Sequence, residues 1–362
     1  MSRRGPFKDI SERDWKDRAW QMAHRVRSGA ALSRILPDLA GPGRDAEDVS
    51  PVYPFAVTPY YLSLIDPRSK DDPIALQCLP RKAELRSSPG VPEDPLKEEE
   101  AMPVPGLIRR YGDRCLVLVT GECAVLCRHC NRRRYWKTGR KRLSSGKLDA
   151  IMAYMSGDPS LREVILSGGD PLTLDHPSLR RILQALTSIP HVRLVRIGTR
   201  IPVVLPMAVD DGLLDLLQAF RPLWIVTQFN HPRELTEEAQ TACTALLERG
   251  IPILNQSVLL RGVNDSVATL KALFQGLVEW GVKPYYLFHC EPVRGVEHFR
   301  VPIKEGIALF RAIRNTVSGI ALPRFVYDLP GGRGKYPLEF DPGPPAEGEG
   351  NELSFDRNGE ID

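Results

Sequence analysis

The sequence has little net charge and no long hydrophobic run. In its 362 residues, 49 lysines and arginines are set against 45 aspartates and glutamates, which leaves a net charge of +4. So small an excess does not by itself indicate nucleic acid or an anionic membrane as a partner. No apolar stretch approaches the roughly 20 residues of a membrane span, and the polar N-terminus lacks the apolar core of a signal peptide. These absences predict a soluble cytoplasmic protein.

Cysteine is also scarce. Seven cysteines are too few for a disulfide scaffold in a chain of this length, and an odd number leaves one of them unpaired. Three of the seven, however, fall within eight residues, at Cys123, Cys127 and Cys130. Such clustering in a cytosolic protein is typical of metal binding or redox chemistry.

The pattern of apolar residues divides the chain into three parts. Residues 1–105 form an N-terminal extension that we expect to be helical at first and mostly irregular later. In residues 106–340, short β-branched runs alternate with longer amphipathic ones, which predicts a parallel α/β sheet with right-handed crossovers. Residues 341–362 are rich in glycine, proline and acidic residues and predict a disordered tail.

Six apolar runs are the expected strands, and a short seventh follows them. They cover residues 116–120, 163–167, 193–197, 223–228, 253–258, 285–288 and 324–327. The β–α alternation alone leaves open whether the sheet is a partial barrel, a complete barrel or a doubly wound open sheet. In each of these architectures the active site lies at the carboxyl ends of the strands, and here those ends carry polar and glycine-rich sequences.

The three clustered cysteines directly follow the first expected strand with the spacing C-x3-C-x2-C. Thiolates are ligands for soft metals, and three on one loop can surround an iron–sulfur cubane. A cluster that only carries electrons takes four cysteines, so three would leave one iron open to bind a substrate or cofactor. A structural zinc site is the alternative, but His129, between two of the cysteines, is poorly placed to be its fourth ligand.

This cysteine loop resembles that of the radical S-adenosylmethionine (SAM) superfamily. The sequence Ser167-Gly168-Gly169-Asp170, after the second expected strand, resembles the glycine-rich motif that binds the methionine amino group of SAM in that superfamily. The resemblance implies a partial (β/α)6-type barrel with a [4Fe-4S] cluster on the three cysteines. In such enzymes the open iron binds SAM, whose reductive cleavage yields a 5′-deoxyadenosyl radical.

Longer motifs narrow the resemblance to the lysine 2,3-aminomutase family. They are CRHCNRRR (127–134), FNHP (229–232), NQSVLLRGVND (255–265) and PGGRGK (330–335). The similarity runs from about residue 58 to about residue 337 and is nearly free of gaps. It implies an isomerase that moves the α-amino group of an L-amino acid from C2 to C3 and uses pyridoxal phosphate as a further cofactor.

The resemblance assigns several residues to the cofactors. Lys335 matches the lysine that forms a Schiff base with pyridoxal phosphate, while Arg110, Tyr111 and Arg114 match the positions that hold its phosphate and ring. Gln256, on the fifth expected strand, is also expected to bind a cofactor. Without the resemblance, Lys335 would be taken for a surface lysine and the two arginines for part of a solvated basic patch.

The expected substrate-binding residues come from the same comparison. Arg132 matches the arginine that pairs with the substrate carboxylate, a task that suits a planar guanidinium. Asp328 matches one of two acidic residues that hold the distal ammonium of lysine, and the other position is Glu291, where the family typically has aspartate. Two carboxylates favour a basic amino acid over glutamate. L-Lysine is therefore the expected substrate, with arginine and ornithine as alternatives because Glu291 is one methylene longer.

The resemblance implies a homodimer or a higher homo-oligomer and an electron donor such as flavodoxin or ferredoxin. The basic stretch 128–142 could instead form a nucleic-acid face, although a carboxylate, a phosphate and SAM explain much of its charge. The alternatives are a radical SAM enzyme without pyridoxal phosphate that modifies a protein or RNA, and a non-catalytic iron–sulfur or zinc protein.

Overall fold

The computed structural model describes residues 5–39, 42–138, 142–329, 331 and 334–339. The tail that we predicted to be disordered, residues 341–362, lies outside these ranges. Among the described helices, none is long and apolar enough to cross a membrane.

One 9-stranded sheet organises the molecule, and its strands lie side by side in the order in which they occur in the chain. The parallel strands are β2 (Arg114–Thr120), β3 (Glu163–Gly168), β4 (Leu194–Gly198), β5 (Leu223–Thr227), β6 (Ile253–Leu259), β7 (Lys283–His289) and β8 (Arg324–Asp328). Two short antiparallel strands, β1 (Leu107–Ile108) and β9 (Lys335–Pro337), form the edges.

This strand order decides between the architectures that the sequence left open. A doubly wound sheet reverses its strand order at a switch point, whereas here each strand pairs with the next one in the chain. No pairing joins the two edge strands within the described part of the chain. The predicted partial barrel is therefore confirmed.

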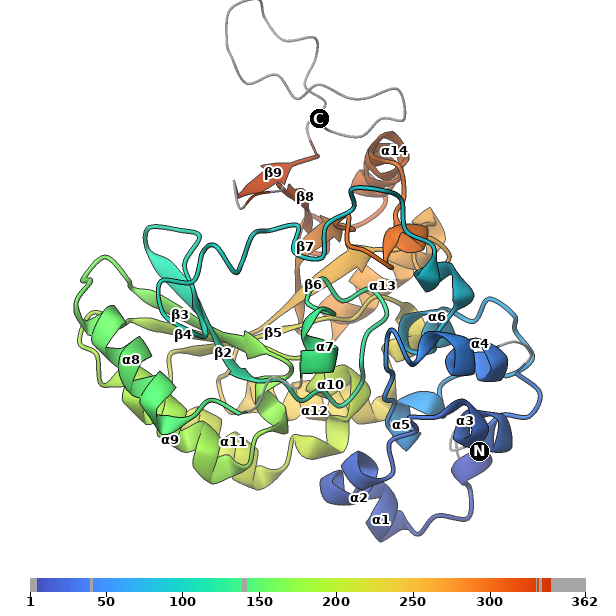
Figure 1. Ribbon diagram of the computed structural model, residues 1–362, viewed down its shortest axis with the longest axis horizontal. Helices are drawn as coiled ribbons and strands as arrows, with labels where there is room; N and C mark the ends of the chain where they lie inside the picture. Colours follow the sequence, from blue (N-terminus) through green and yellow to red (C-terminus); the bar gives the residue numbers. More distant parts are fainter. Residues whose placement is uncertain (1–4, 40–41, 139–141, 330, 332–333, 340–362) are drawn as a thin grey trace, which may run out of the picture.

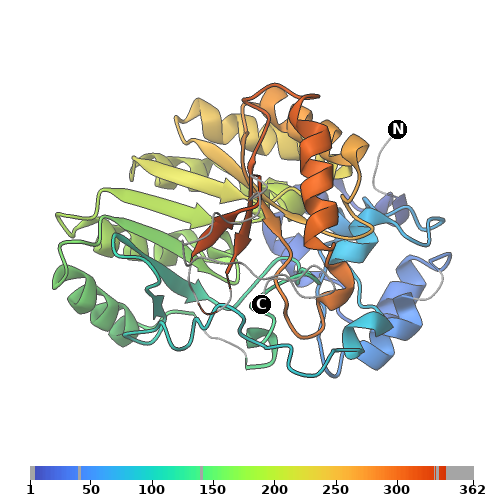
Figure 2. The same cartoon turned by 90° about the horizontal axis from the view of Figure 1, so that it is seen from above.

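Crossover helices cover the outer side of the curved sheet (Figures 1 and 2). They are α8 (Ser145–Ser156), α9 (His176–Thr187), α10 (Ile201–Val204), α11 (Asp211–Gln218), α12 (Glu237–Glu248), α13 (Val267–Glu279) and α14 (Ile303–Arg314). In α9, Asp175 caps the first turn by accepting a hydrogen bond from the amide of Ser178 at 2.8 Å. Leu179, Ile182 and Leu186 are spaced to fall on one face of α9, and all three are buried.

The N-terminal extension is helical, as predicted, and packs beside the barrel (blue in Figure 1). Its helices are α1 (Glu12–Lys16), α2 (Arg18–Ala23), α3 (Gly29–Ile35), α4 (Pro42–Val49), α5 (Pro59–Leu62) and α6 (Pro73–Cys78), with a 3-10 helix η2 (Lys82–Leu85). The later part of the extension, which we expected to be mostly irregular, also contains α6, and the sequence carries a local signal for this helix. Asp72 caps α6 through the amides of Ile74 and Ala75, and Pro73 occupies its first position.

An irregular segment, residues 86–106, leads from η2 to β1 and is called the strap below (teal in Figures 1 and 2). Backbone hydrogen bonds hold it in place: the carbonyl of Pro92 accepts from the amide of Arg294, and that of Pro95 accepts from Gly331, both at 3.0 Å. Leu96 and Glu98 of the strap line the main cavity of the barrel.

Candidate active site

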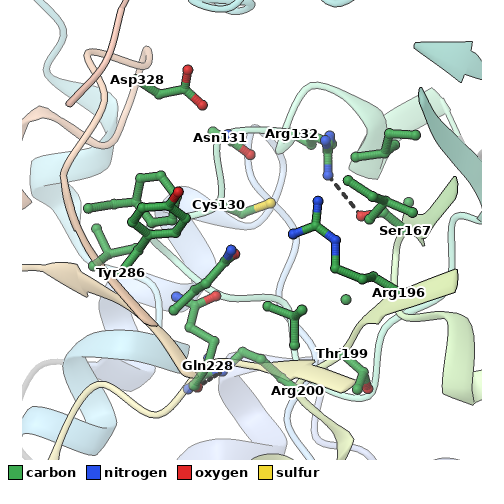
Figure 3. A pocket seen from close by; sticks show the side chains of 18 of the residues that line it. Cys130, Asn131, Arg132, Ser167, Arg196, Thr199, Arg200, Gln228, Tyr286 and Asp328 are labelled. Atoms are coloured by element: carbon green, nitrogen blue, oxygen red, sulfur yellow. Dashed lines mark hydrogen bonds between the residues drawn. The ribbon is translucent and has the colours of Figure 1, made fainter. Parts of the chain in front are cut away.

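A cavity of about 800 Å³ lies within the barrel and extends to the carboxyl ends of its strands (Figure 3). Every site residue predicted from the sequence lines it. These are Arg110, Tyr111, Arg114, Cys123, Cys127, Cys130, Arg132, Ser167, Gly168, Gly169, Asp170, Gln256, Glu291, Asp328 and Lys335. The topology thus brings residues more than 200 positions apart in the chain, such as Arg110 and Lys335, to one enclosed space.

The three clustered cysteines lie on the loop after β2, and none of them forms a disulfide. Burial and the neighbouring thiols raise the pKa of Cys130 to about 11 and hold that of Cys123 well above its ordinary value. An iron cluster would stabilise the deprotonated form of these cysteines, because iron binds the thiolate. No three acidic, histidine or cysteine side chains of the described ranges converge on a single metal ion, whereas a cubane takes its thiolates at separate irons. The donor set fits a cluster with one open iron.

Two further residues lie around this loop: the sequence analysis did not assign Arg200 to the site, and it considered His129 only as a zinc ligand. Arg200, on the loop after β4, places Nη1 2.8 Å from the sulfur of Cys127. His129 is buried, which holds its pKa well below the ordinary value, and its Nε2 lies 2.9 Å from Nε2 of Gln228. Its Nδ1 has no hydrogen-bond partner among the described residues. An unsatisfied buried nitrogen on a cavity-lining residue is consistent with a bound cofactor.

The glycine-rich motif packs the end of β3 against the cysteine loop. A Cβ on Gly168, whose φ is +122°, would lie 2.4 Å from the carbonyl oxygen of Thr120, and one on Gly169 would lie 2.2 Å from that of Glu122. Asp170 accepts hydrogen bonds from the hydroxyl of Thr199 at 2.6 Å and the amide of Arg200 at 2.7 Å. The motif therefore joins the loops after β2, β3 and β4, and its contact with SAM stays a prediction.

Lys335, the first residue of β9, directs its amine into an aromatic corner of the cavity. Its Nζ lies 3.2 Å from the hydroxyl of Tyr111 and 5.9 and 5.8 Å from the ring centres of Tyr286 and Phe288. The guanidinium of Arg114 stacks on the ring of Tyr111 at 3.8 Å. An amine, aromatic rings and a guanidinium fit a planar pyridine ring that carries a phosphate.

Arg110 connects two roles that the sequence analysis kept apart. Its guanidinium donates to both oxygens of Asp328, at 2.7 and 3.4 Å, and both side chains are almost fully buried. Nζ of Lys335 lies 3.8 Å from the same carboxylate. The expected phosphate-binding arginine and the expected substrate-binding aspartate are thus paired with each other.

Glu291 follows β7 and accepts a hydrogen bond from the side-chain amide of Asn131 at 2.7 Å. Burial, and after it the negative charge of Asp328, raise the pKa of Glu291 to about 7. A cation close to Glu291 would favour the charged form of its carboxyl group and lower this pKa.

Replacing Glu291 by glutamine should remove a pH-dependent loss of stability. Because folding raises the pKa from an ordinary 4.5 to about 7, the wild type should lose stability as pH rises through this interval, by up to about 3 kcal/mol. Glutamine has the same shape but does not titrate. Urea unfolding of the cofactor-free proteins at pH 5 and pH 8 measures the difference. Equal losses in the two proteins would show that Glu291 titrates normally.

Arg132 is held by a residue that the sequence analysis did not identify. Its Nε and Nη2 donate to the carboxylate of Glu98 at 2.9 and 2.6 Å, and its Nη1 donates to the hydroxyl of Ser167 at 3.0 Å (dashed in Figure 3). Ser167, which we assigned to SAM, thus also contacts the expected substrate arginine.

Comparisons with known proteins agree with an iron–sulfur cluster on the cysteine loop. Residues 117–273 match the family model of the Radical SAM superfamily. The chain is 43% identical over 332 residues to the L-lysine 2,3-aminomutase of Clostridium subterminale, covering 92% of this chain and 80% of that protein. It is 41% identical to the L-lysine 2,3-aminomutase of Acetoanaerobium sticklandii, with the same coverage. It is also 38% identical to the glutamate 2,3-aminomutase of Clostridioides difficile, covering 91% of this chain and 78% of that protein.

Proposed function

Because this chain belongs to the lysine 2,3-aminomutase family of radical SAM isomerases, we propose that it moves the α-amino group of a basic L-amino acid, above all L-lysine, from C2 to C3. Membership implies a [4Fe-4S] cluster and SAM. Pyridoxal phosphate, a homo-oligomeric assembly and an electron donor such as flavodoxin or ferredoxin are further parts of the proposal.

The side chains of the cavity divide the work. Cys123, Cys127 and Cys130 would hold the cluster, which together with SAM supplies a carbon radical that removes a hydrogen atom from the substrate. Lys335 would anchor pyridoxal phosphate, which supplies a carbonyl carbon for the migrating nitrogen and a ring that delocalises an unpaired electron. The aromatic corner around Lys335 would exclude water from that ring.

The substrate would lie between two charged sides of the cavity. Arg132 would bind its carboxylate, while Glu291 and Asp328 would bind the ammonium at the end of its side chain. Arg132, just after the cysteine loop, and Asp328, at the end of β8, line this cavity from different elements (Figure 3). Two fixed contacts of this kind orient C2 and C3 for the transfer.

The two acidic residues, Glu291 and Asp328, would determine which amino acid is preferred. Glu291 and Asp328 repel each other, and this repulsion adds to burial in raising the pKa of Glu291 to about 7. A substrate ammonium would relieve the repulsion, whereas glutamate would add a third carboxylate. Glutamate is the second candidate, because one relative carries that name and because Arg110, 2.7 Å from Asp328, offsets part of the negative charge.

An anaerobic substrate panel tests the proposal. The protein, supplied with iron, sulfide, pyridoxal phosphate, SAM and a reductant, is incubated with lysine, ornithine, arginine or glutamate, and products are identified by mass spectrometry. A basic amino acid should turn over at least about tenfold faster than glutamate, since one charged hydrogen bond contributes about 1.5–3 kcal/mol. Faster turnover of glutamate would overturn the assignment.

A variant of Glu291 and a surface control test whether this residue determines the preference for basic substrates. Glu291→Gln should reduce the preference for basic substrates. Glu305→Gln, which removes a surface ion pair with Arg261 at 3.0 Å, should leave it unchanged.

A further inference from the structure

Glu98 holds Arg132 along one edge of its guanidinium. Nε donates to the two carboxylate oxygens at 3.1 and 2.9 Å, and Nη2 donates to one of them at 2.6 Å. A guanidinium carries five N–H groups in a rigid planar fork. Nε and Nη2 share one edge of this fork, so Glu98 makes a side-on, bidentate pair.

The remaining edge, between Nη1 and Nη2, is only partly used. Nη1 donates one hydrogen bond to the hydroxyl of Ser167 at 3.0 Å. Arg132 lines the cavity, and within the described part of the chain one hydrogen on each of these two nitrogens has no recorded acceptor. Two such hydrogens can bind a carboxylate end-on while Glu98 stays in place.

Glu98 is itself firmly fixed. Its exposed fraction is 3%, and a second guanidinium, that of Arg134, donates to it at 3.0 Å. Burial alone would raise the pKa of Glu98, but Arg132 and then Arg134 outweigh burial and lower this pKa to about 2. Glu98 is therefore charged at any working pH. Its strap is held to the barrel by the backbone bonds of Pro92 and Pro95.

Displacement of Glu98 by a substrate is unfavourable for the same reasons. A carboxylate that took over the side-on edge would leave Glu98 buried and charged beside a single remaining cation. Removing one partner of a buried ion pair is strongly unfavourable. Binding of a carboxylate at the Nη1–Nη2 edge leaves the pair between Glu98 and Arg132 intact.

We propose that Glu98 is a positioning residue: it locks the Arg132 guanidinium side-on, so that the end-on edge between Nη1 and Nη2 faces the cavity and binds the carboxylate of the amino-acid substrate. This assignment rests on the proposed function, because it takes the substrate to be an amino acid bound by Arg132. It also gives the strap a role in recognising the substrate.

Equilibrium binding to the holoprotein tests the role of Glu98. The protein is loaded with cluster and pyridoxal phosphate but receives no SAM, so that no turnover occurs. Calorimetry then compares L-lysine with cadaverine, which is lysine without its carboxylate. Glu98→Gln should raise the Kd of L-lysine at least tenfold and change that of cadaverine less than twofold. In turnover assays KM should rise while kcat changes little.

The matched control is Glu100→Gln on the same strap. The Glu100 carboxylate is 71% exposed and pairs only loosely with Lys97, at 3.4 Å, so this variant should bind both ligands like the wild type. Iron content and the cofactor absorbance should be equal in all three proteins, which separates a positioning role from general damage to the site.

Several outcomes would overturn the assignment. They are an unchanged Kd for L-lysine in Glu98→Gln, a tighter one, which would mean that Glu98 competes with the substrate, or an equal weakening for both ligands. If Glu98→Gln does not fold, Glu98→Asp decides. Its shorter side chain cannot reach both nitrogens, so a Kd for L-lysine raised at least threefold supports the role and an unchanged one refutes it.

Failure of the proposed function gives a different signature. If the wild type binds L-lysine no better than cadaverine, lysine is not the substrate. The same comparison is then made with the amino acid that turns over in the panel and its decarboxylated amine, which decides the role of Glu98 independently.

Discussion

Replacing Lys335 by alanine is expected to abolish both the covalent attachment of pyridoxal phosphate and turnover. Lys335 is the one lysine among the described residues that line the cavity, and its amine lies 3.2 Å from the hydroxyl of Tyr111. No other described amine can take its place there. Loss of the covalent anchor should leave the cofactor to be washed out, while the iron cluster is retained.

Borohydride reduction followed by peptide mass spectrometry measures this effect. The wild type should carry the reduced cofactor on the peptide that contains Lys335, and the alanine variant should carry none. Lys97→Ala, which changes an exposed lysine of the strap, serves as the control and should be labelled fully at Lys335. Labelling of another lysine in the wild type would show that Lys335 is misassigned.

Replacing Glu84 by glutamine should have the largest effect on stability. Glu84 is completely buried and accepts hydrogen bonds from Nε and Nη2 of Arg128 at 3.0 and 2.6 Å and from Nη2 of Arg133. Glutamine would leave two buried guanidinium groups without a negative charge, which should cost about 3–5 kcal/mol. Because both arginines belong to the cysteine loop or follow it directly, iron loading should fall as well.

Urea unfolding of the cofactor-free chain and iron analysis after anaerobic reconstitution test this prediction. Glu93→Gln removes an exposed ion pair with Arg294 at 3.5 Å and should change stability by less than about 1 kcal/mol. A similarly small change in Glu84→Gln, with full iron loading, would contradict the role given to the buried triad.

The sequence predicts the sheet well because its signals are local. The run expected at 116–120 is β2 (Arg114–Thr120), and the run at 285–288 is β7 (Lys283–His289). Short apolar stretches bounded by turns mark such buried strands. The cysteine loop was likewise found from spacing alone, while the cofactor and substrate residues required the family resemblance.

The residues that the sequence did not reveal act through distant partners. Glu98 and Arg132 are 34 positions apart, Cys127 and Arg200 are 73 apart, and Asn131 and Glu291 are 160 apart. Glu98 also lies on an irregular strap, where no periodicity tells a buried side chain from an exposed one. Only the fold specifies which charged residue meets which.

The position of Lys335 on the last strand has a consequence for the order in which the protein is completed during synthesis. Tyr111 and Arg110 follow β1, and their partners Lys335 and Asp328 lie 224 and 218 residues later. The three cysteines lie within eight residues of one another, and the sulfur of Cys127 contacts Arg200, which lies only 73 residues later. Contacts between such distant positions close the longest loops and form late. A nascent chain would therefore carry its iron-binding half before the pocket for its second cofactor exists.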